Sequence, residues 1–370
     1  MLCLRLGLIG LCLVAPLAAG PIVSVRDYGA LGDGVADDTA AIQAAVDAVA
    51  GQSGIVDIPD GTYRINAAQG VHLKSQTTLQ LAPQATLQAI PNALEHSHIL
   101  RVRDVEQVRI TGGILEGDRD HHLGQTGEWG HGIDIRHSKE VTVEKLTVRR
   151  CWGDGIYVGG DSSQITIDHV TADRNRRQGL SITSGVQIEV RDSLFQRTQG
   201  TAPECGIDIE PNTKETVSQC QILRCQFLDN AGGGLQVGPA NADRGQAFVN
   251  EFVAEGNIFE RNGSSDPPHY AIQILHCEGA VVRNNFLRAN RGIGIGIVSC
   301  SRVQVLKNQI TGTRWTGNKS DAGILISEDT ASVVRDNTVL NNEGYGIFMW
   351  KSSVDLRKNK VYENAKGNRN

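Results

Sequence analysis

Several features that mark other protein classes are scarce in this chain of 370 residues. Aromatic residues make up only 5% of it, so platforms on which single-stranded nucleic acids stack are not expected. The formal net charge is −5, whereas a dedicated nucleic-acid binder normally carries a basic stripe. The composition therefore predicts no nucleic-acid partner.

Metal-binding cysteine patterns are also missing. The chain has 8 cysteines but no CxxC pair, and no His/Cys cluster has the spacing of a zinc site. We therefore assign no metal-ligating residues from the sequence.

Long apolar runs are absent beyond the N-terminus. The first residues carry one basic side chain, Arg5, then an apolar run over 6–17, then small residues over 18–20. This is the pattern of a secretory signal, and the run is shorter than the ~20 residues of a membrane span. We predict a signal peptide over 1–20 and a secreted or periplasmic mature chain, 21–370, without stable membrane insertion. An uncleaved anchor is the alternative.

What the chain does have is a repeat. A glycine (once alanine) is followed by an apolar residue, any residue and another apolar residue. The copies are Gly132–Ile135, Gly155–Val158, Gly179–Ile182, Gly206–Ile209, Gly234–Val237, Ala271–Ile274, Gly294–Ile297, Gly323–Ile326 and Gly346–Met349. The shortest spacing is 23 residues, with sporadic lengthening. Such self-similarity predicts a solenoid whose coils carry insertions at one corner.

Asparagines recur at a second fixed place in the coils. They are Asn257, Asn285, Asn308, Asn337 and Asn359, and Ser193 and Cys225 hold the matching place in earlier coils. Asparagine tolerates left-handed backbone and bonds to nearby backbone groups, so it suits a tight corner between strands. We expect these side chains to stack from coil to coil.

Each repeat is too short for a strand-helix-strand unit and is rich in β-branched residues, and the leucine-rich-repeat frame is absent. The sequence therefore predicts an all-β, single-domain right-handed parallel β-helix, with repeat coils over about 98–370. Cys277 and Cys300 lie 23 residues apart, each just after the first strand of its coil. Adjacent coils are ~4.8 Å apart, which allows either a disulfide or a buried thiol stack.

The opening of the mature chain carries three motifs: DYGALGDG from Asp27, DDTAAIQAA from Asp37 and IPDGTY from Ile58. Together they resemble the start of the pectate-lyase-like superfamily of right-handed parallel β-helix proteins. That resemblance implies the fold, with 21–65 as a capping segment, and not one reaction. The superfamily includes polygalacturonases, rhamnogalacturonases, pectate lyases, alginate epimerases, glucanases and phage tailspikes.

The same opening has a physical interpretation. Asp38 or Thr39 can begin a helix whose apolar positions lie on one face, and that helix would cover the open first coil. We therefore expect a structural role for the acidic residues Asp27, Asp33, Asp37 and Asp38.

Candidate site residues gather on one predicted sheet. The third residue of each repeat points outward, and the loop before each repeat takes the insertions. We propose as catalytic candidates His131, Asp134, Asp154, Glu204, Asp208 and Glu210, and as substrate-binding candidates Trp129, Trp152, Tyr157, Arg176, Arg177, Gln178 and Gln236. Carboxylates, arginine and aromatic rings together are typical of a saccharide groove. The neighbouring acids Asp208 and Glu210 can raise each other's pKa and so form a general acid.

The polygalacturonase motifs match only in part. Trp152-Gly153-Asp154-Gly155 is similar to their Asn-Thr-Asp-Gly. At the next two junctions the chain has Arg177-Gln178 and Glu204-Cys205, where those enzymes have paired aspartates and then a histidine. Their mechanism is therefore not carried over, and the Asp-Pro-His motif of alginate epimerases is also absent.

Three functions stay open. The first is an exported glycoside hydrolase with two carboxylates and no required cofactor. The second is a polysaccharide lyase or C5-epimerase on uronates, with Arg177 neutralising the carboxylate, His131 and Tyr157 moving protons, and Ca²⁺ as a possible cofactor. The third is a non-catalytic saccharide-binding β-helix.

Overall fold

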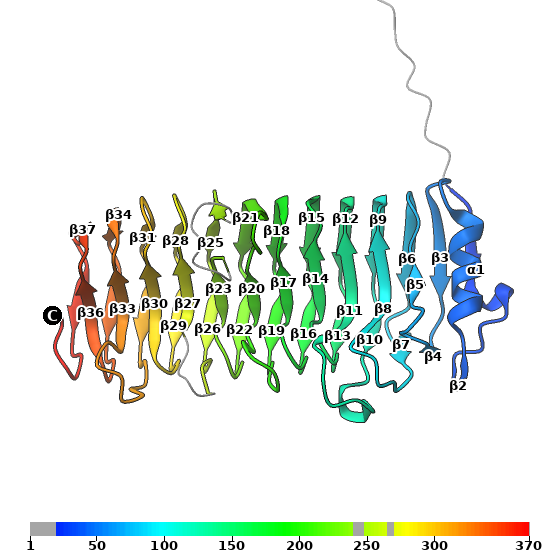
Figure 1. Cartoon of the computed structure of the whole chain (residues 1–370), viewed down its shortest axis with the longest axis horizontal. Helices are drawn as coiled ribbons and strands as arrows, with labels where there is room; N and C mark the ends of the chain where they lie inside the picture. The colour runs from blue at the N-terminus through cyan, green and yellow to red at the C-terminus, as the bar shows by residue number, and fades with distance from the viewer. Residues whose placement is uncertain (1–19, 240–247, 265–269, 370) are drawn as a thin grey trace, which may run out of the picture.

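The computed structural model describes residues 20–239, 248–264 and 270–369, and it is a parallel β-helix (Figure 1). The expected signal peptide over 1–20 falls almost wholly outside the described residues. In the described part, no helix is long and apolar enough to cross a membrane.

Three parallel sheets, here called A, B and C, make up the walls of the solenoid. Sheet A contains β1 (Ile22–Ser24), β3 (Gly54–Ile58), β6 (Thr77–Leu81), β9 (Glu106–Thr111), β12 (Lys139–Glu144), β15 (Ser162–Asp168), β18 (Gly185–Arg191), β21 (Thr216–Leu223), β24 (Phe248–Asn250), β25 (Val253–Glu255), β28 (Val281–Arg283), β31 (Gln304–Leu306), β34 (Thr330–Arg335) and β37 (Ser353–Asp355). Sheet B contains β2 (Asp33–Asp37), β4 (Thr62–Ile65), β7 (Thr86–Ala89), β10 (Ile114–Glu116), β13 (Thr147–Arg149), β16 (Thr171–Asp173), β19 (Leu194–Gln196), β22 (Gln226–Leu228), β26 (Ile258–Glu260), β29 (Phe286–Arg288), β32 (Gln309–Thr311), β35 (Thr338–Leu340) and β38 (Lys360–Tyr362). Sheet C contains β5 (Val71–His72), β8 (His96–Arg103), β11 (Trp129–Arg136), β14 (Ile156–Gly159), β17 (Leu180–Ile182), β20 (Ile207–Ile209), β23 (Leu235–Val237), β27 (Tyr270–Leu275), β30 (Ile293–Val298), β33 (Ala322–Ser327) and β36 (Tyr345–Trp350).

The core fills the space between the sheets. The apolar residues of each repeat point inward, and Phe195, Phe227 and Phe259 stack with centroid separations of 5.5 and 4.5 Å. Because every coil repeats the same inward positions, each new coil extends one continuous core. The predicted all-β solenoid is confirmed.

Helix α1 (Thr39–Val49) covers the N-terminal end of this core (Figure 1). Its predicted buried face is present, and it contains Ile42, Ala45, Val46 and Val49. The carboxylate of Asp38 does not cap the helix; it accepts hydrogen bonds from the backbone N–H groups of Leu31 (2.6 Å) and Gly32 (3.1 Å). It therefore fixes the incoming chain, which is a structural role. Two short 3-10 helices, η1 (Val25–Tyr28) and η2 (Arg119–His121), complete the described helices.

The predicted asparagine stack joins sheet A to sheet B. Each buried side chain donates from Nδ2 to the next Oδ1, at 2.9–3.0 Å from Asn257 through Asn359. A second stack, which the sequence analysis missed, precedes sheet C and includes Asn230, Asn262 and Asn290. These amides satisfy backbone groups that the corners would otherwise leave buried and unpaired.

Replacing Asn285 by alanine should lower the free energy of unfolding by about 2 kcal/mol. Its amide donates to Ala254 O (3.0 Å) and Asn308 Oδ1 (2.9 Å), and its Oδ1 accepts from the backbone of Asn257 (2.9 Å). Denaturant unfolding measures the loss. Gln309→Ala, an exposed change on β32, is the control and should stay within about 0.5 kcal/mol. Equal losses in both variants would contradict the structural role of the stack.

The six cysteines of the described residues are free and buried. Cys277 and Cys300 form a thiol stack, with the Cys277 backbone N–H 3.4 Å from Cys300 Sγ. Of the two arrangements that the sequence left open, the structure has the stacked thiols.

Candidate functional site

The outward-facing row predicted from the repeats forms on sheet C. Strand pairing places in register Arg101, Asp134, Tyr157, Ser181, Asp208, Gln236, Gln273, Gly296, Leu325 and Phe348. The polar members occupy the first half of the solenoid, as expected. The loops that precede β11, β14, β17 and β20 lie beside them.

Arg177 is the centre of the polar region. Its guanidinium lies 3.4 Å from Asp154 Oδ1 and 3.2 Å from Glu128 Oε2, and it contacts the Ser181 hydroxyl at 3.3 Å. Only 17% of the Arg177 side chain is exposed. One cation is therefore shared between a buried carboxylate and a half-exposed carboxylate.

Acidic groups outnumber the guanidinium in the surroundings of Arg177. Burial alone would lower its pKa, but four neighbouring carboxyl groups raise that pKa instead: Asp154, Glu128, Asp208 and Glu210. Burial raises the pKa of Asp154 to about 6, and the charge of Arg177 opposes this shift. Four carboxyl groups around one guanidinium favour the retention of at least one proton.

Asp208 and Glu210 are two of these carboxyl groups, and burial favours the protonated form of each. Both are on sheet C or at its edge, and burial raises the pKa of each carboxyl, of Asp208 the more strongly. Asp208 Oδ1 has no hydrogen-bond partner among the described residues, which adds to the cost of ionising this buried carboxyl. Glu210 is the solvent-facing member of this acid pair, because Asp208 is 1% exposed.

Gln178 holds the Asp208 side chain in place through two hydrogen bonds of its own amide. Its Nε2 donates to Asp208 Oδ2 at 2.8 Å, and its Oε1 accepts from the backbone N–H of Cys205 at 2.7 Å. Gln178 is fully buried, so its amide is a support for Asp208 and not a surface contact.

His131 lies one coil before Asp154, and it is buried. Its Nδ1 accepts from the Asp154 backbone N–H at 3.1 Å, and burial lowers its pKa well below the usual range. Its ring stacks between His98 (5.1 Å) and Tyr157 (5.2 Å). The Tyr157 hydroxyl bonds to Thr183 at 2.8 Å. The imidazole of His131 is therefore neutral at physiological pH.

Asp134 is committed to two arginines. Arg136 Nε donates to its Oδ1 at 2.8 Å, and Arg103 pairs with its Oδ2. The guanidinium of Arg136 also lies 4.2 Å over the Tyr157 ring. Asp134 therefore orients two cations at the N-terminal part of the row.

Two groups of described residues bring three possible metal ligands together, His98/His131/Asp134 and Asp168/His169/Asp192. The first fits a cation poorly, because both oxygens of Asp134 already face guanidinium groups. In the second, Asp168 and Asp192 each pair with an arginine as well. We assign no metal to either group.

Aromatic rings stand at the rim of the row. Trp129 stacks on His96 (4.6 Å) and is 37% exposed, whereas Trp152 stacks on His122 (4.0 Å). Arg176 lies 3.8 Å over the Trp152 ring and donates to the Gly127 carbonyl at 2.9 Å. These contacts hold the rim loops together and leave part of Trp129 open.

The other expected residues are Glu204, whose carboxylate turns away from the row, and Gln236, which lies in it. The Glu204 carboxylate accepts from the Gly200 backbone N–H at 2.6 Å, so it closes its own loop. Gln236 is the register neighbour of Asp208 on β23. Glu128 received no role from the sequence, although it was in the loop before the first repeat, because only the folded loop brings it to Arg177.

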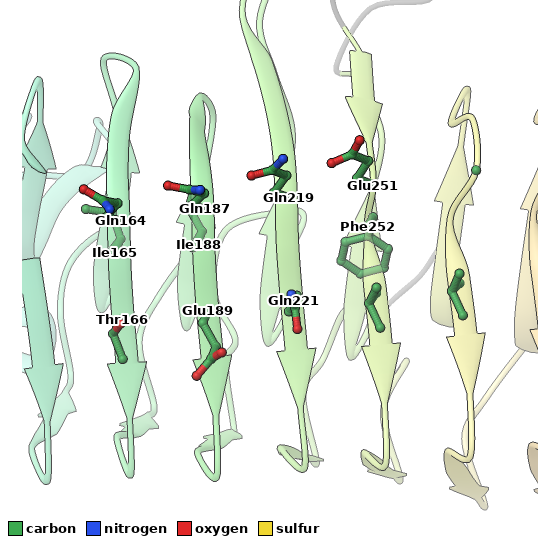
Figure 2. Close-up of a pocket in the computed structure, with 13 residues that line it drawn as sticks. Gln164, Ile165, Thr166, Gln187, Ile188, Glu189, Gln219, Gln221, Glu251 and Phe252 are labelled. Carbon is green, nitrogen blue, oxygen red and sulfur yellow. The ribbon is translucent and has the colours of Figure 1, made fainter. Parts of the chain in front are cut away.

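A separate groove of about 740 Å³ crosses sheet A at β15, β18, β21 and β25 (Figure 2). Gln164, Gln187, Gln219 and Glu251 line one side of it in successive coils. None of its lining residues belongs to the Arg177 cluster on sheet C, so it is not part of the candidate site.

Comparison with known proteins defines the class. Residues 22–235, more than half of the chain, match the model of the rhamnogalacturonase A/epimerase, pectate lyase-like family, and residues 205–368 match that of the right-handed β-helix region. The chain therefore belongs to the rhamnogalacturonase A/epimerase, pectate lyase-like family. That family acts on polysaccharides, and the resemblance found in the opening motifs is confirmed.

Particular relatives are distant. The uncharacterized protein YclG of Bacillus subtilis is 26% identical over 90% of this chain, which spans only 61% of the length of that relative. The A-module of the Azotobacter vinelandii mannuronan C-5 epimerase AlgE6 has a TM-score of 0.74 at 18% identity and covers 94% of this chain and 97% of its own. The Streptococcus pneumoniae surface adhesin PfbA has a TM-score of 0.72 at 18% identity, with 94% and 93% covered. These structures agree in fold.

Proposed function

We propose that the protein is an exported glycoside hydrolase that cleaves a polysaccharide bound along sheet C. The observation that carries the proposal is the acid pair of Asp208 and Glu210 near Arg177, together with the carboxylate of Glu128, which pairs with that arginine at 3.2 Å. Glycoside hydrolysis needs one carboxyl that holds a proton and one carboxylate that does not.

In this mechanism Glu210 donates its proton to the glycosidic oxygen as the bond to the anomeric carbon breaks. Glu128 accepts a proton from the water whose oxygen bonds to that carbon. Asp208 is the buried partner of Glu210, and Arg177 pairs with Glu128 and Asp154 near the developing positive charge of the sugar. Asp154, which is fully buried, acts as a positioning residue for Arg177.

A second candidate is a uronate C5-epimerase or lyase, which could require Ca²⁺. The neutral His131 stacked on Tyr157 favours it, because a neutral imidazole and a phenol can move a C5 proton. The name of the AlgE6 module is in line with this chemistry. The burial of His131 weighs against direct contact with a substrate, so we place this function second.

Product analysis on a polysaccharide panel separates the candidates. Pectins, alginate, rhamnogalacturonan and neutral glucans are incubated with the protein, with and without Ca²⁺. We expect new reducing ends without the ultraviolet absorbance of unsaturated uronates. Absorbance together with reducing ends would establish a lyase, and C5 proton exchange without cleavage would establish an epimerase.

A further inference from the structure

The outward face of sheet C changes character towards the C-terminus. Beyond Gln273 the row continues with Gly296, Leu325 and Phe348, none of which is charged. The Tyr270 ring lies against Gly296, where an added Cβ would come within 2.2 Å of it. The polar row therefore gives way to an apolar strip on the same face.

Exposed tryptophans flank the end of this strip. Trp350, the last residue of β36, is 49% exposed, and Trp315, in the loop before β33, is 50% exposed. The Trp315 backbone N–H donates to Glu343 Oε2 at 2.9 Å, just before β36, and on β36 the ring centroids of Phe348 and Tyr345 are 5.4 Å apart. We call Trp315, Tyr345, Phe348 and Trp350 the distal aromatic surface. Several large aromatic side chains exposed together on one surface are typical of a binding site, whereas single exposed apolar residues are common on any protein.

Each of the two tryptophans also carries a cation. Lys351 Nζ lies 4.1 Å from the Trp350 ring and 3.8 Å from Glu328 Oε1. Lys366 Nζ lies 4.1 Å from the Trp315 ring and donates to the Asn318 carbonyl at 3.4 Å, so both ammonium groups keep further donor capacity. A ring offers a flat apolar surface to the C–H face of a sugar, and an adjacent ammonium offers a charge partner to a sugar carboxylate. The combination suits an acidic sugar chain better than a neutral one.

We infer that the distal aromatic surface binds a remote stretch of the polysaccharide whose cleavage we propose at Glu210, and that this polysaccharide is acidic. This inference rests on the proposed function for its substrate. Five coil steps separate Asp208 from Phe348, which is about 24 Å at ~4.8 Å per coil. Only a chain that spans several sugar residues reaches both places, so the surface selects long polymers over short ones.

The test is calorimetric binding of trigalacturonate and of an oligogalacturonate long enough to span five coils, with oligomannuronates as a second series. Glu210→Gln serves as the parent, so that turnover does not consume the ligand. We expect the parent to bind the long chain at least tenfold more tightly than the trimer. The double variant Trp315→Ala/Trp350→Ala should lose that preference and bind the trimer within about twofold of the parent.

Tyr362→Ala is the matched control, because this tyrosine is 43% exposed in the last coil but belongs to sheet B. It should keep the chain-length preference. The inference is overturned if the double variant keeps the preference, if the control loses it equally, or if the parent binds neither series. It is also overturned if sedimentation shows a dimer that the double variant dissociates, since a second copy would then cover the surface. Binding by Glu210→Gln, together with no hydrolysis of the same ligand by the unsubstituted protein, would overturn the proposed function alone.

Discussion

Replacing Glu210 by glutamine should lower kcat/KM on the cleaved polysaccharide by roughly 10³-fold. Glutamine keeps the shape of the side chain, but it has no acidic proton for the leaving oxygen. The melting temperature should stay close to that of the unsubstituted protein, which is the parent throughout this Discussion. The change removes one of the crowded carboxylates around Arg177. Initial-rate measurements and thermal unfolding check both parts.

The control for this variant is Glu189→Gln, on β18 of sheet A, where the carboxylate pairs with Arg191 at 3.1 Å on the surface. It should leave kcat/KM within about twofold, because it lies outside the candidate site. If Glu189→Gln and Glu210→Gln were equally impaired, the acid role of Glu210 would be excluded.

The pH profile of the parent follows from the same acid pair. Burial raises the pKa of Glu210, so the protonated form persists above the usual carboxyl range. The rate should therefore fall as pH rises through the pKa of the pair, and this alkaline limb should be missing from the residual activity of Glu210→Gln. A limb that persists unchanged would assign the titration to another group.

Replacing Arg177 by methionine should lower the free energy of unfolding at pH 7 by about 3 kcal/mol and abolish measurable turnover. The change removes the cation shared by Asp154 and Glu128 and leaves Asp154 buried without its partner. The pKa of Asp154 is already raised to about 6, and loss of Arg177 should raise it further. Denaturant unfolding at several pH values measures the effect.

The sign of the pH dependence is fixed. A carboxyl whose folded-state pKa lies above its unfolded value of 3.8 binds more protons in the folded state. Its contribution to stability is fully present below about pH 4 and is lost as pH rises through the folded-state pKa. The deficit of Arg177→Met relative to the parent should therefore be smaller at pH 5 than at pH 7. A deficit that is equal at both values would contradict the account.

Arg261→Met is the control for this second prediction. Arg261 pairs with Asp229 at 2.7 Å, and the two side chains are 45% and 44% exposed. Because exposed ion pairs contribute little, its loss should cost less than about 1 kcal/mol at either pH.

The positions that recur in every coil were predictable from the sequence. Asp208 and Tyr157 were assigned to one outward row because strand alternation and the repeat length fix their register. The stack of Asn257 and Asn285 followed from the same periodicity. In-register stacking converts a constant spacing in sequence into a constant place on the solenoid.

The inserted loops were not predictable in this way. Glu128 reaches Arg177 across 49 positions of sequence, and only the folded loop before β11 brings it there. Glu204 was assigned to the site, but its carboxylate turns to the backbone of Gly200. The partners of Asp134 were missed as well, since Arg103 lies 31 residues earlier in the chain. The orientation of a loop side chain depends on its local hydrogen bonds. These do not repeat from coil to coil, so the sequence period does not predict them.

The most direct test of the account is the fate of solvent oxygen. The polysaccharide substrate is incubated in ¹⁸O-labelled water with the parent, with Glu210→Gln or with Glu189→Gln. The masses of the products are then measured by mass spectrometry. Hydrolysis predicts one ¹⁸O at each new reducing end with the parent and Glu189→Gln, and almost no cleavage with Glu210→Gln. Unlabelled fragments that end in an unsaturated sugar, or label incorporation that survives in Glu210→Gln, would contradict it.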